Sequence, residues 1–261
     1  MSATYTKITY KIVDAAAVIG FDIPEDGNRI GLVAMKEIMA AMDEANQDEK
    51  AHSIILTGEG EVFCLGGRID GFPVGYAMDQ KEYSDAMVAM LKHIYASKKP
   101  VIAAVNGNAF AGGFMVVESC DLAIASDEAQ FGLTELVATG NYPVIALAVN
   151  GRSVPKKRLF EMILTGSPVS AVTAADWNLI NCVVPKEDVL KKALEYAAII
   201  ADRSPVALAF GRQTYYQMLE LTPQMAMEYA KPALLSFLAM EDVKEGALAA
   251  KEGRKPNYIG K

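Results

Sequence analysis

Two glycine-rich turns, each preceded by a short apolar run, most constrain how this chain can fold. The apolar run 53–57 leads into the turn 62–69, and the apolar run 100–105 leads into the turn 105–114. A strand that passes through glycines into a helix leaves backbone N–H groups without helical acceptors, and glycine lets a ligand approach that backbone closely. If the two turns converge, they can hold one anionic oxygen between two N–H donors.

The turns belong to a longer series of motifs. They read V-F-C-L-G-G-R-I at 62–69 and V-N-G-N-A-F-A-G-G-F at 105–114. The later motifs are C-D-L-A-I-A-S at 120–126, A-Q-F-G-L-T-E at 129–135, L-T-G at 164–166 and A-V-T-A-A-D-W-N-L-I-N-C-V-V-P at 171–185. In this order, and over essentially the whole chain, the series resembles the crotonase (enoyl-CoA hydratase/isomerase) superfamily.

Strand-like apolar runs alternate with helical patterns, which predicts an α/β fold. One predicted helix runs from an N-cap at Asn28 to about Ala45. This alternation also allows a doubly wound sheet, whereas the resemblance implies a spiral of ββα repeats. We expect residues 1–195 to form this spiral core with the oxyanion hole, and residues 196–261 to form a C-terminal helical region. The resemblance implies that this region packs against neighbouring subunits in a homotrimer or homohexamer.

The composition indicates a globular protein and argues against several partners. The 261 residues are 52% hydrophobic, and the net charge of −7 disfavours nucleic-acid binding, which needs clustered Lys and Arg. No apolar run is long enough to cross a bilayer, so we expect no membrane partner. The scattered cysteines and the lack of a signal-peptide pattern lead us to expect a cytoplasmic protein. The two histidines, His52 and His93, lack metal-ligand spacing, and no metal or prosthetic group is expected.

The resemblance implies an enzyme that stabilises the enolate of an acyl-CoA thioester. By position, the two donors are the backbone N–H groups of Leu65 and Gly112, and coenzyme A enters as part of the substrate. A helix that begins near Gly112 adds its dipole to the second donor. The residues expected to contact the coenzyme A part of the substrate are Leu65, Gly66, Gly67, Arg68, Gly112, Arg254 and Lys255.

The acid and base groups decide the reaction. Hydratases of the superfamily use two glutamates, but here the first of these positions holds Met115 and only the second holds a carboxylate, Glu135. One glutamate beside an oxyanion hole suits the transfer of one proton between two carbons, as in the isomerases that the chain resembles. We therefore expect a raised pKa at Glu135. Glu118, the nearest other carboxylate in the sequence, is interpreted as a surface or capping charge.

The loop after Glu135 runs one residue longer than the usual pattern to its proline. Asn141 and Tyr142 in this loop are expected to reach the acyl pocket together with Met115. Double-bond isomerisation is the leading function, with hydration close behind. Two alternatives remain open: hydrolysis, decarboxylation or ring opening of an acyl-CoA on the same fold, and a non-catalytic member that acts by binding or assembly.

Overall fold

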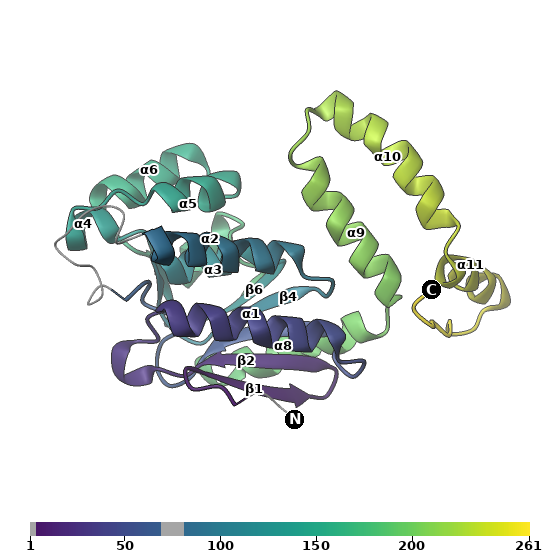
Figure 1. The fold of residues 1–261 in the computed structure, drawn as a ribbon, viewed down its shortest axis with the longest axis horizontal. Helices are drawn as coiled ribbons and strands as arrows, with labels where there is room; N and C mark the ends of the chain where they lie inside the picture. Colours follow the sequence, from purple (N-terminus) through teal and green to yellow (C-terminus); the bar gives the residue numbers. More distant parts are fainter. Residues whose placement is uncertain (1–3, 69–80) are drawn as a thin grey trace.

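The computed structural model describes residues 4–68 and 81–261, and Figure 1 shows how their elements are arranged. Six strands form the main sheet in the order β1-β2-β3-β4-β6-β9, in which β1 and β2 pair antiparallel and the other neighbours pair parallel. These strands are β1 (Ile8–Val13), β2 (Ala16–Phe21), β3 (Ser53–Gly58), β4 (Val101–Val105), β6 (Leu122–Ser126) and β9 (Cys182–Val184).

A second, smaller sheet carries the pieces that build the site. It consists of β5 (Ala109–Phe110), β7 (Gln130–Gly132) and β8 (Val169–Ser170), in the order β5-β7-β8. The chain twice runs from a strand of the main sheet through a strand of the small sheet into a helix, as β4–β5–α3 and β6–β7–α4. These are the expected ββα repeats, and the α/β spiral is confirmed.

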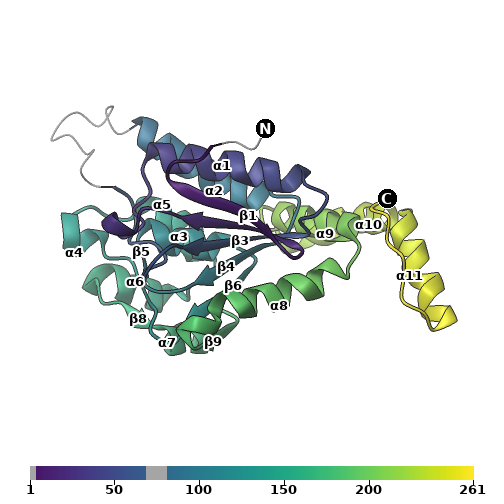
Figure 2. The same cartoon turned by 90° about the horizontal axis from the view of Figure 1, so that it is seen from below.

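Helices cover both faces of the main sheet (Figure 2). Because side chains alternate along a strand, β2 sends Ala17, Ile19 and Phe21 to one face and Ala16 and Val18 to the other. The first face packs against α1 (Leu32–Gln47), α2 (Lys81–Ala96) and α3 (Gly112–Ser119), and the second packs against α8 (Val189–Ala201). Four short helices lie between β7 and β9 along the chain: α4 (Glu135–Thr139), α5 (Val144–Val149), α6 (Lys156–Thr165) and α7 (Ala171–Asp176).

Three C-terminal helices extend beyond this core (Figure 1). They are α9 (Pro205–Met218), α10 (Pro223–Leu238) and α11 (Glu241–Glu252). The expected boundary after residue 195 lies inside α8, whose residues Val189, Ala193 and Ala197 are buried against the sheet. The structural break comes instead between α8 and α9. No helix in the described ranges is long and apolar enough to cross a membrane.

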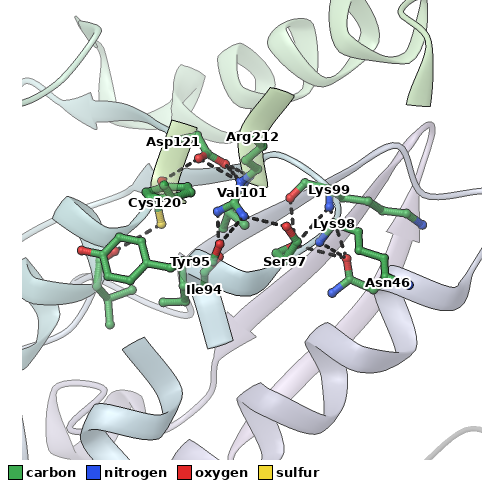
Figure 3. Close-up of polar contacts among 12 residues, drawn as sticks. Asn46, Ile94, Tyr95, Ser97, Lys98, Lys99, Val101, Cys120, Asp121 and Arg212 are labelled. Carbon is green, nitrogen blue, oxygen red and sulfur yellow. Dashed lines mark hydrogen bonds and ion pairs between the residues drawn. The ribbon is translucent and has the colours of Figure 1, made fainter. Parts of the chain in front are cut away.

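Arg212 of α9 fastens this C-terminal region to the core (Figure 3). Its guanidinium donates to both carboxylate oxygens of Asp121 at 2.9 and 2.7 Å. It also donates to the carbonyls of Ile94, Tyr95 and Ser97, at the end of α2, over 2.6–2.7 Å. A cation at this position complements both the unpaired carbonyls and the negative end of the helix dipole.

Asn28 has a different role from the predicted helix cap. Helix α1 begins at Leu32 with Gly31 as its N-cap, while Asn28 is fully buried with a φ of 54°. Its side chain accepts from the Ile23 N–H at 3.0 Å and donates to the carbonyls of Glu59 and Val62 at 2.9 and 2.8 Å. Through these hydrogen bonds, Asn28 holds the backbone at the start of the first glycine-rich turn in place.

Candidate active site

Three chain segments run parallel and end side by side to form the candidate site. Cys64 forms a parallel β-bridge with Ala109 of β5, and Ala109 pairs in register with Phe131 of β7. Hydrogen bonds from Phe110 N–H to the Cys64 carbonyl (2.9 Å) and from Ala111 N–H to the Gly132 carbonyl (2.8 Å) fix this alignment. Adjacent strands lie about 4.8 Å apart. The next few residues of each segment, which include Gly67, Gly112 and Glu135, therefore leave the small sheet at one edge.

The first turn presents a donor at Gly67 rather than at Leu65. The Leu65 N–H already donates to the Gly27 carbonyl at 3.0 Å, and this bond corrects the prediction of a free donor there. The Gly66 N–H lies 3.4 Å from the Cys64 sulfur. The Gly67 N–H, in contrast, has no acceptor within residues 4–68 and 81–261. The first amide able to serve an anionic oxygen is therefore two residues later than the sequence indicated.

The Gly112 amide lies at a helix start, as the sequence predicted. Gly112 is the first residue of α3, so its N–H is one of those that a helix start leaves without an intrahelical acceptor. A Cβ built on Gly112 would lie 3.5 Å from the Gly67 nitrogen, so the Gly67 and Gly112 nitrogens are at most about 6 Å apart. One oxygen can accept from two amides that are up to about 6 Å apart. The two turns therefore converge as expected.

The start of α3 is held in a strained conformation. Its N-cap, Ala111, has φ 49° and ψ −118°, a region that alanine adopts at a cost of about 1–3 kcal/mol. Gly66, with φ +107°, lies against it, since a Cβ on Gly66 would be 2.9 Å from the Ala111 Cβ. The close approach of the two turns thus depends on glycine at position 66.

Glu135 has the environment of a proton-transfer group. It is the first residue of α4, it is half-buried, and its Oε2 is fully buried with no hydrogen-bond partner among the described residues. Burial raises the pKa of this carboxyl above its ordinary value, and a hydrogen bond to its own amide opposes the rise. A poorly solvated carboxyl with a raised pKa is suited to take and return a proton near neutral pH.

The position of the first hydratase glutamate is apolar. Met115 on α3 is 6% exposed and belongs to the main core. Glu118 is not the surface charge that we expected, because its Oε1 is fully buried, Ser153 donates to its Oε2, and burial raises its pKa to about 7. Glu118 nevertheless lies about 9 Å further along the α3 axis than Gly112 and cannot replace the group missing at Met115.

Glu118 instead lines a separate cavity of about 630 Å³ beneath α9. Other lining residues are Tyr95, Cys120, Arg152 and Tyr216. Sequence reasoning missed this cavity, because residues from α2, α3 and α9 meet there only after folding. In the described part of the chain, no group of three or more His, Cys, Asp or Glu residues could hold a metal ion.

The two predicted residues of the loop after α4 have different surroundings. Asn141 is exposed, whereas Tyr142 is half-buried and packs against the main core cluster. The loop connects α4 to α5, and the Tyr142 carbonyl accepts from the Val144 N–H at 2.8 Å. Tyr142 is therefore placed as a packing residue, and Asn141 faces solvent in the single chain.

The predicted contacts for coenzyme A do not converge within one chain. Arg68 lies beside the first turn, with its Nε 3.3 Å from a carboxylate oxygen of Asp26. Arg254 instead pairs with Glu245 and Glu252, and Lys255 pairs with Asp202. These two residues follow α11, at the opposite end of the molecule from α4 (Figure 1). Within one chain, Arg254 and Lys255 therefore lie apart from Arg68.

Another cation, missed in the sequence, lies beside the first turn. Arg29 donates to the Leu65 carbonyl at 2.8 Å, and its Nε is 3.8 Å from Asp26. Arg29 and Arg68 thus flank the same carboxylate next to the glycines. The sequence offered no signal for Arg29, since it is 36 residues away from Leu65 along the chain.

This arrangement can be compared with known proteins. The family model described as enoyl-CoA hydratase/isomerase matches residues 11–261. The chain belongs to this family. The mouse mitochondrial enoyl-CoA hydratase domain-containing protein 3 is 32% identical to this enoyl-CoA hydratase/isomerase family member over 241 residues, which cover 89% of this chain and 78% of the mouse protein. Carnitinyl-CoA dehydratase from Proteus mirabilis is 32% identical over 222 residues, which cover 82% of this chain and 84% of the Proteus protein.

Solved structures of the same family have the same fold. The crystal structure of human enoyl coenzyme A hydratase domain-containing protein 3 matches with a TM-score of 0.92 and 28% identity, covering 97% of this chain and 100% of the human one. An enoyl-CoA hydratase from Bacillus anthracis matches with a TM-score of 0.91 and 26% identity, covering 98% of this chain and 100% of the Bacillus chain. The chain is thus a crotonase-superfamily member whose relatives support an acyl-CoA enzyme.

Proposed function

We propose that this family member shifts a carbon–carbon double bond in an enoyl-CoA thioester. The Gly67 and Gly112 amides hold the thioester oxygen, and Glu135 moves the proton. The observation that carries the proposal is the register of the small sheet, which brings a buried carboxyl to the edge where both amides emerge. Met115 stands where hydratases of the superfamily have the first of their two glutamates, which favours one proton carrier over two.

The proposed reaction needs no group besides these. Glu135 removes a proton from C2 of a 3-enoyl-CoA, and the electron pair moves onto the thioester oxygen as a dienolate. The two amides stabilise that charge, and in other enzymes one such donor typically contributes ~3–4 kcal/mol. The Glu135 acid then returns the proton to C4, which leaves a 2-enoyl-CoA.

A Glu135→Gln variant tests the proposal against a panel of 3-enoyl-, 2-enoyl- and 3-oxoacyl-CoA thioesters. The amide keeps the shape of the side chain but cannot accept the proton, so we expect turnover to fall by at least ~100-fold while thioester binding persists. The matched control is Glu187→Gln, which changes an exposed glutamate. Wild-type turnover by Glu135→Gln would remove the proposed base.

The masses of the products separate the candidate reactions. Isomerisation leaves the mass unchanged, hydration adds one water, and hydrolysis or decarboxylation splits the substrate. Hydration is the second candidate, because one carboxylate can also activate a water molecule. Absence of any thioester binding in calorimetry would favour a non-catalytic role instead.

We also propose that the protein works as a homotrimer or homohexamer. The C-terminal helices support this, because α10 exposes a series of large apolar side chains in the single chain. These are Met225, Met227, Leu234, Leu235 and Leu238, each at least 50% exposed. Exposed apolar surface of this kind marks an interface. Analytical ultracentrifugation should give three or six times the 28.1 kDa chain mass, and a monomer would contradict the proposal.

A further inference from the structure

Tyr83 of α2 lies directly against the first turn of the site. A Cβ built on Gly67 would lie 2.0 Å from the Tyr83 hydroxyl oxygen. The hydroxyl is therefore at most about 3.6 Å from the Gly67 Cα. Nothing in the sequence connects these residues, since α2 begins well after the first turn. Only the fold brings a phenol to the amide that we assign to the thioester oxygen.

Within the described residues, the hydroxyl makes one long hydrogen bond. It donates to the Ile30 carbonyl at 3.2 Å, and the same carbonyl accepts from the Arg68 N–H, also at 3.2 Å. The bond from the hydroxyl is longer than the 2.7–2.8 Å typical of O–H···O pairs, and the bond from the amide is at the long end of the N–H···O range. Exchange of this long bond for one to a more negative oxygen is therefore favourable, because bonds to charged acceptors are shorter and stronger.

The surroundings of Tyr83 keep it protonated. The side chain is half-buried, and its ring packs against the main core cluster. Burial raises the pKa of Tyr83 well above its ordinary value. A phenol of this kind donates a hydrogen bond rather than a proton. It thus complements Glu135, the proposed proton carrier.

The side chains around the second turn supply no comparable donor. A Cβ on Gly112 would lie 3.3 Å from the methyl group of Met87, one turn after Tyr83 on α2. Met115 follows on α3 and is also a thioether. Among these three side chains near the two glycines, Tyr83 alone has a polar hydrogen.

We propose that the Tyr83 hydroxyl is a third hydrogen-bond donor to the thioester oxygen, beside the Gly67 and Gly112 amides. This inference rests on the proposed function and adds a residue from α2 to the same site. As negative charge on the oxygen grows towards the enolate, the hydroxyl leaves the Ile30 carbonyl for the stronger acceptor. Its contribution is therefore larger in the transition state than in the bound substrate.

The test compares Tyr83→Phe with Tyr5→Phe. Tyr5 is a matched control, because its half-buried hydroxyl also makes one hydrogen bond, to Glu44 at 2.9 Å, on α1. We expect Tyr83→Phe to lower kcat by ~10- to 100-fold on the enoyl-CoA that the panel identifies, with KM changed by less than about threefold. Tyr5→Phe should keep the wild-type kcat.

A spectroscopic readout distinguishes a donor from a structural residue. Hexanoyl-CoA labelled with 13C at the thioester carbonyl is bound to each protein, and its C=O stretch is measured by isotope-edited infrared spectroscopy. Hydrogen bonds lower this frequency, so the band should lie below its position in buffer for wild type and Tyr5→Phe. For Tyr83→Phe the C=O band should shift part of the way back towards its position in buffer.

Each other outcome overturns the inference in a recognisable way. A wild-type kcat and band in Tyr83→Phe would mean that the hydroxyl does not touch the substrate. A lower kcat with a wild-type band would make Tyr83 a positioning residue and refute the donor role. If wild type binds no acyl-CoA, the proposed function fails and this inference with it. If acyl-CoA binds but Glu135→Gln keeps full turnover, only the assignment of Glu135 as the base is wrong.

Discussion

Replacement of Arg212 by methionine removes the guanidinium that joins α9 to the end of α2. Arg212 is 9% exposed, and its side chain makes five hydrogen bonds to four residues. Methionine keeps much of the apolar stem but offers no donor. The variant therefore leaves the Asp121 carboxylate without its cation and three carbonyls without their donor.

The expected loss follows from the surroundings of Asp121. Removal of one partner from a buried ion pair typically costs about 3–5 kcal/mol of the free energy of unfolding. Asp121 keeps its bonds from the Val101 N–H (2.7 Å) and the Tyr216 hydroxyl (2.9 Å). Arg212, Asp121 and Tyr95 also line the cavity of about 630 Å³, which gives water a route to the groups that lose the guanidinium. Both effects reduce the loss, so we expect about 3 kcal/mol, at the lower end of that range.

Urea unfolding, followed by the fluorescence of the single tryptophan, Trp177, measures this loss at one fixed protein concentration. The matched control is Arg152→Met, which breaks a 2.7 Å pair with Glu220 whose side chains are 49% and 67% exposed. That exposed pair should contribute no more than about 1 kcal/mol. Equal losses in the two variants would refute the reasoning that burial makes the Arg212 contacts strong.

Four further outcomes test other parts of the structure. Ala111→Gly should raise the free energy of unfolding by about 1 kcal/mol, since relief of the strained φ and ψ exceeds the entropy that glycine adds to the unfolded chain; a lower urea midpoint would contradict this. Gly67→Ala should lower kcat by ~100-fold, because its Cβ would displace the Tyr83 hydroxyl. Gly151→Ala is the control and should keep the wild-type kcat, because the nearest atom to its Cβ is 3.7 Å away. Equal turnover by the two variants would count against the site. The raised pKa of Glu118, about 7 in the folded state against an ordinary 4.5, makes the folded state bind this proton more tightly, so stability should fall as pH rises from about 4.5 to about 7. Glu118→Gln should flatten this fall, and an unchanged slope would assign it elsewhere. The acid limb of kcat/KM against pH should lie above 4.5 because burial raises the pKa of Glu135, and a limb at or below that value would contradict the assignment.

Local sequence patterns predicted the elements that carry strong periodic signals. The helix Gly112–Ser119 begins where the sequence predicted, because a glycine turn after an apolar run is a local signal. The short helices α4 to α7 escaped prediction. Each has at most ten residues, and their stability comes from packing rather than from propensity.

The donor at the first turn shows where motif matching stops. The motif located the turn, but the choice between Leu65 and Gly67 depends on a hydrogen bond to Gly27, which lies 38 residues earlier. Similarly, the sequence led to the prediction that Glu118 is a surface charge, yet the turn that contains Ser153 packs over this side chain. Both errors arose because an amide or a carboxyl is defined by partners that are distant in sequence.

The amino-acid sequence by itself determined the α/β class, the two glycine-rich turns, the start of a helix at Gly112 and the presence of Met115 in place of a carboxylate. These features follow from local patterns and residue identities. Only the tertiary structure decided that Gly67 presents the first free amide, that Tyr83 lies against it, and that Arg254 and Lys255 lie far from both. The physical reason is that the availability of a donor, the pKa of a carboxyl and the distance between two charges depend on which segments pack together. That packing is a property of the whole fold.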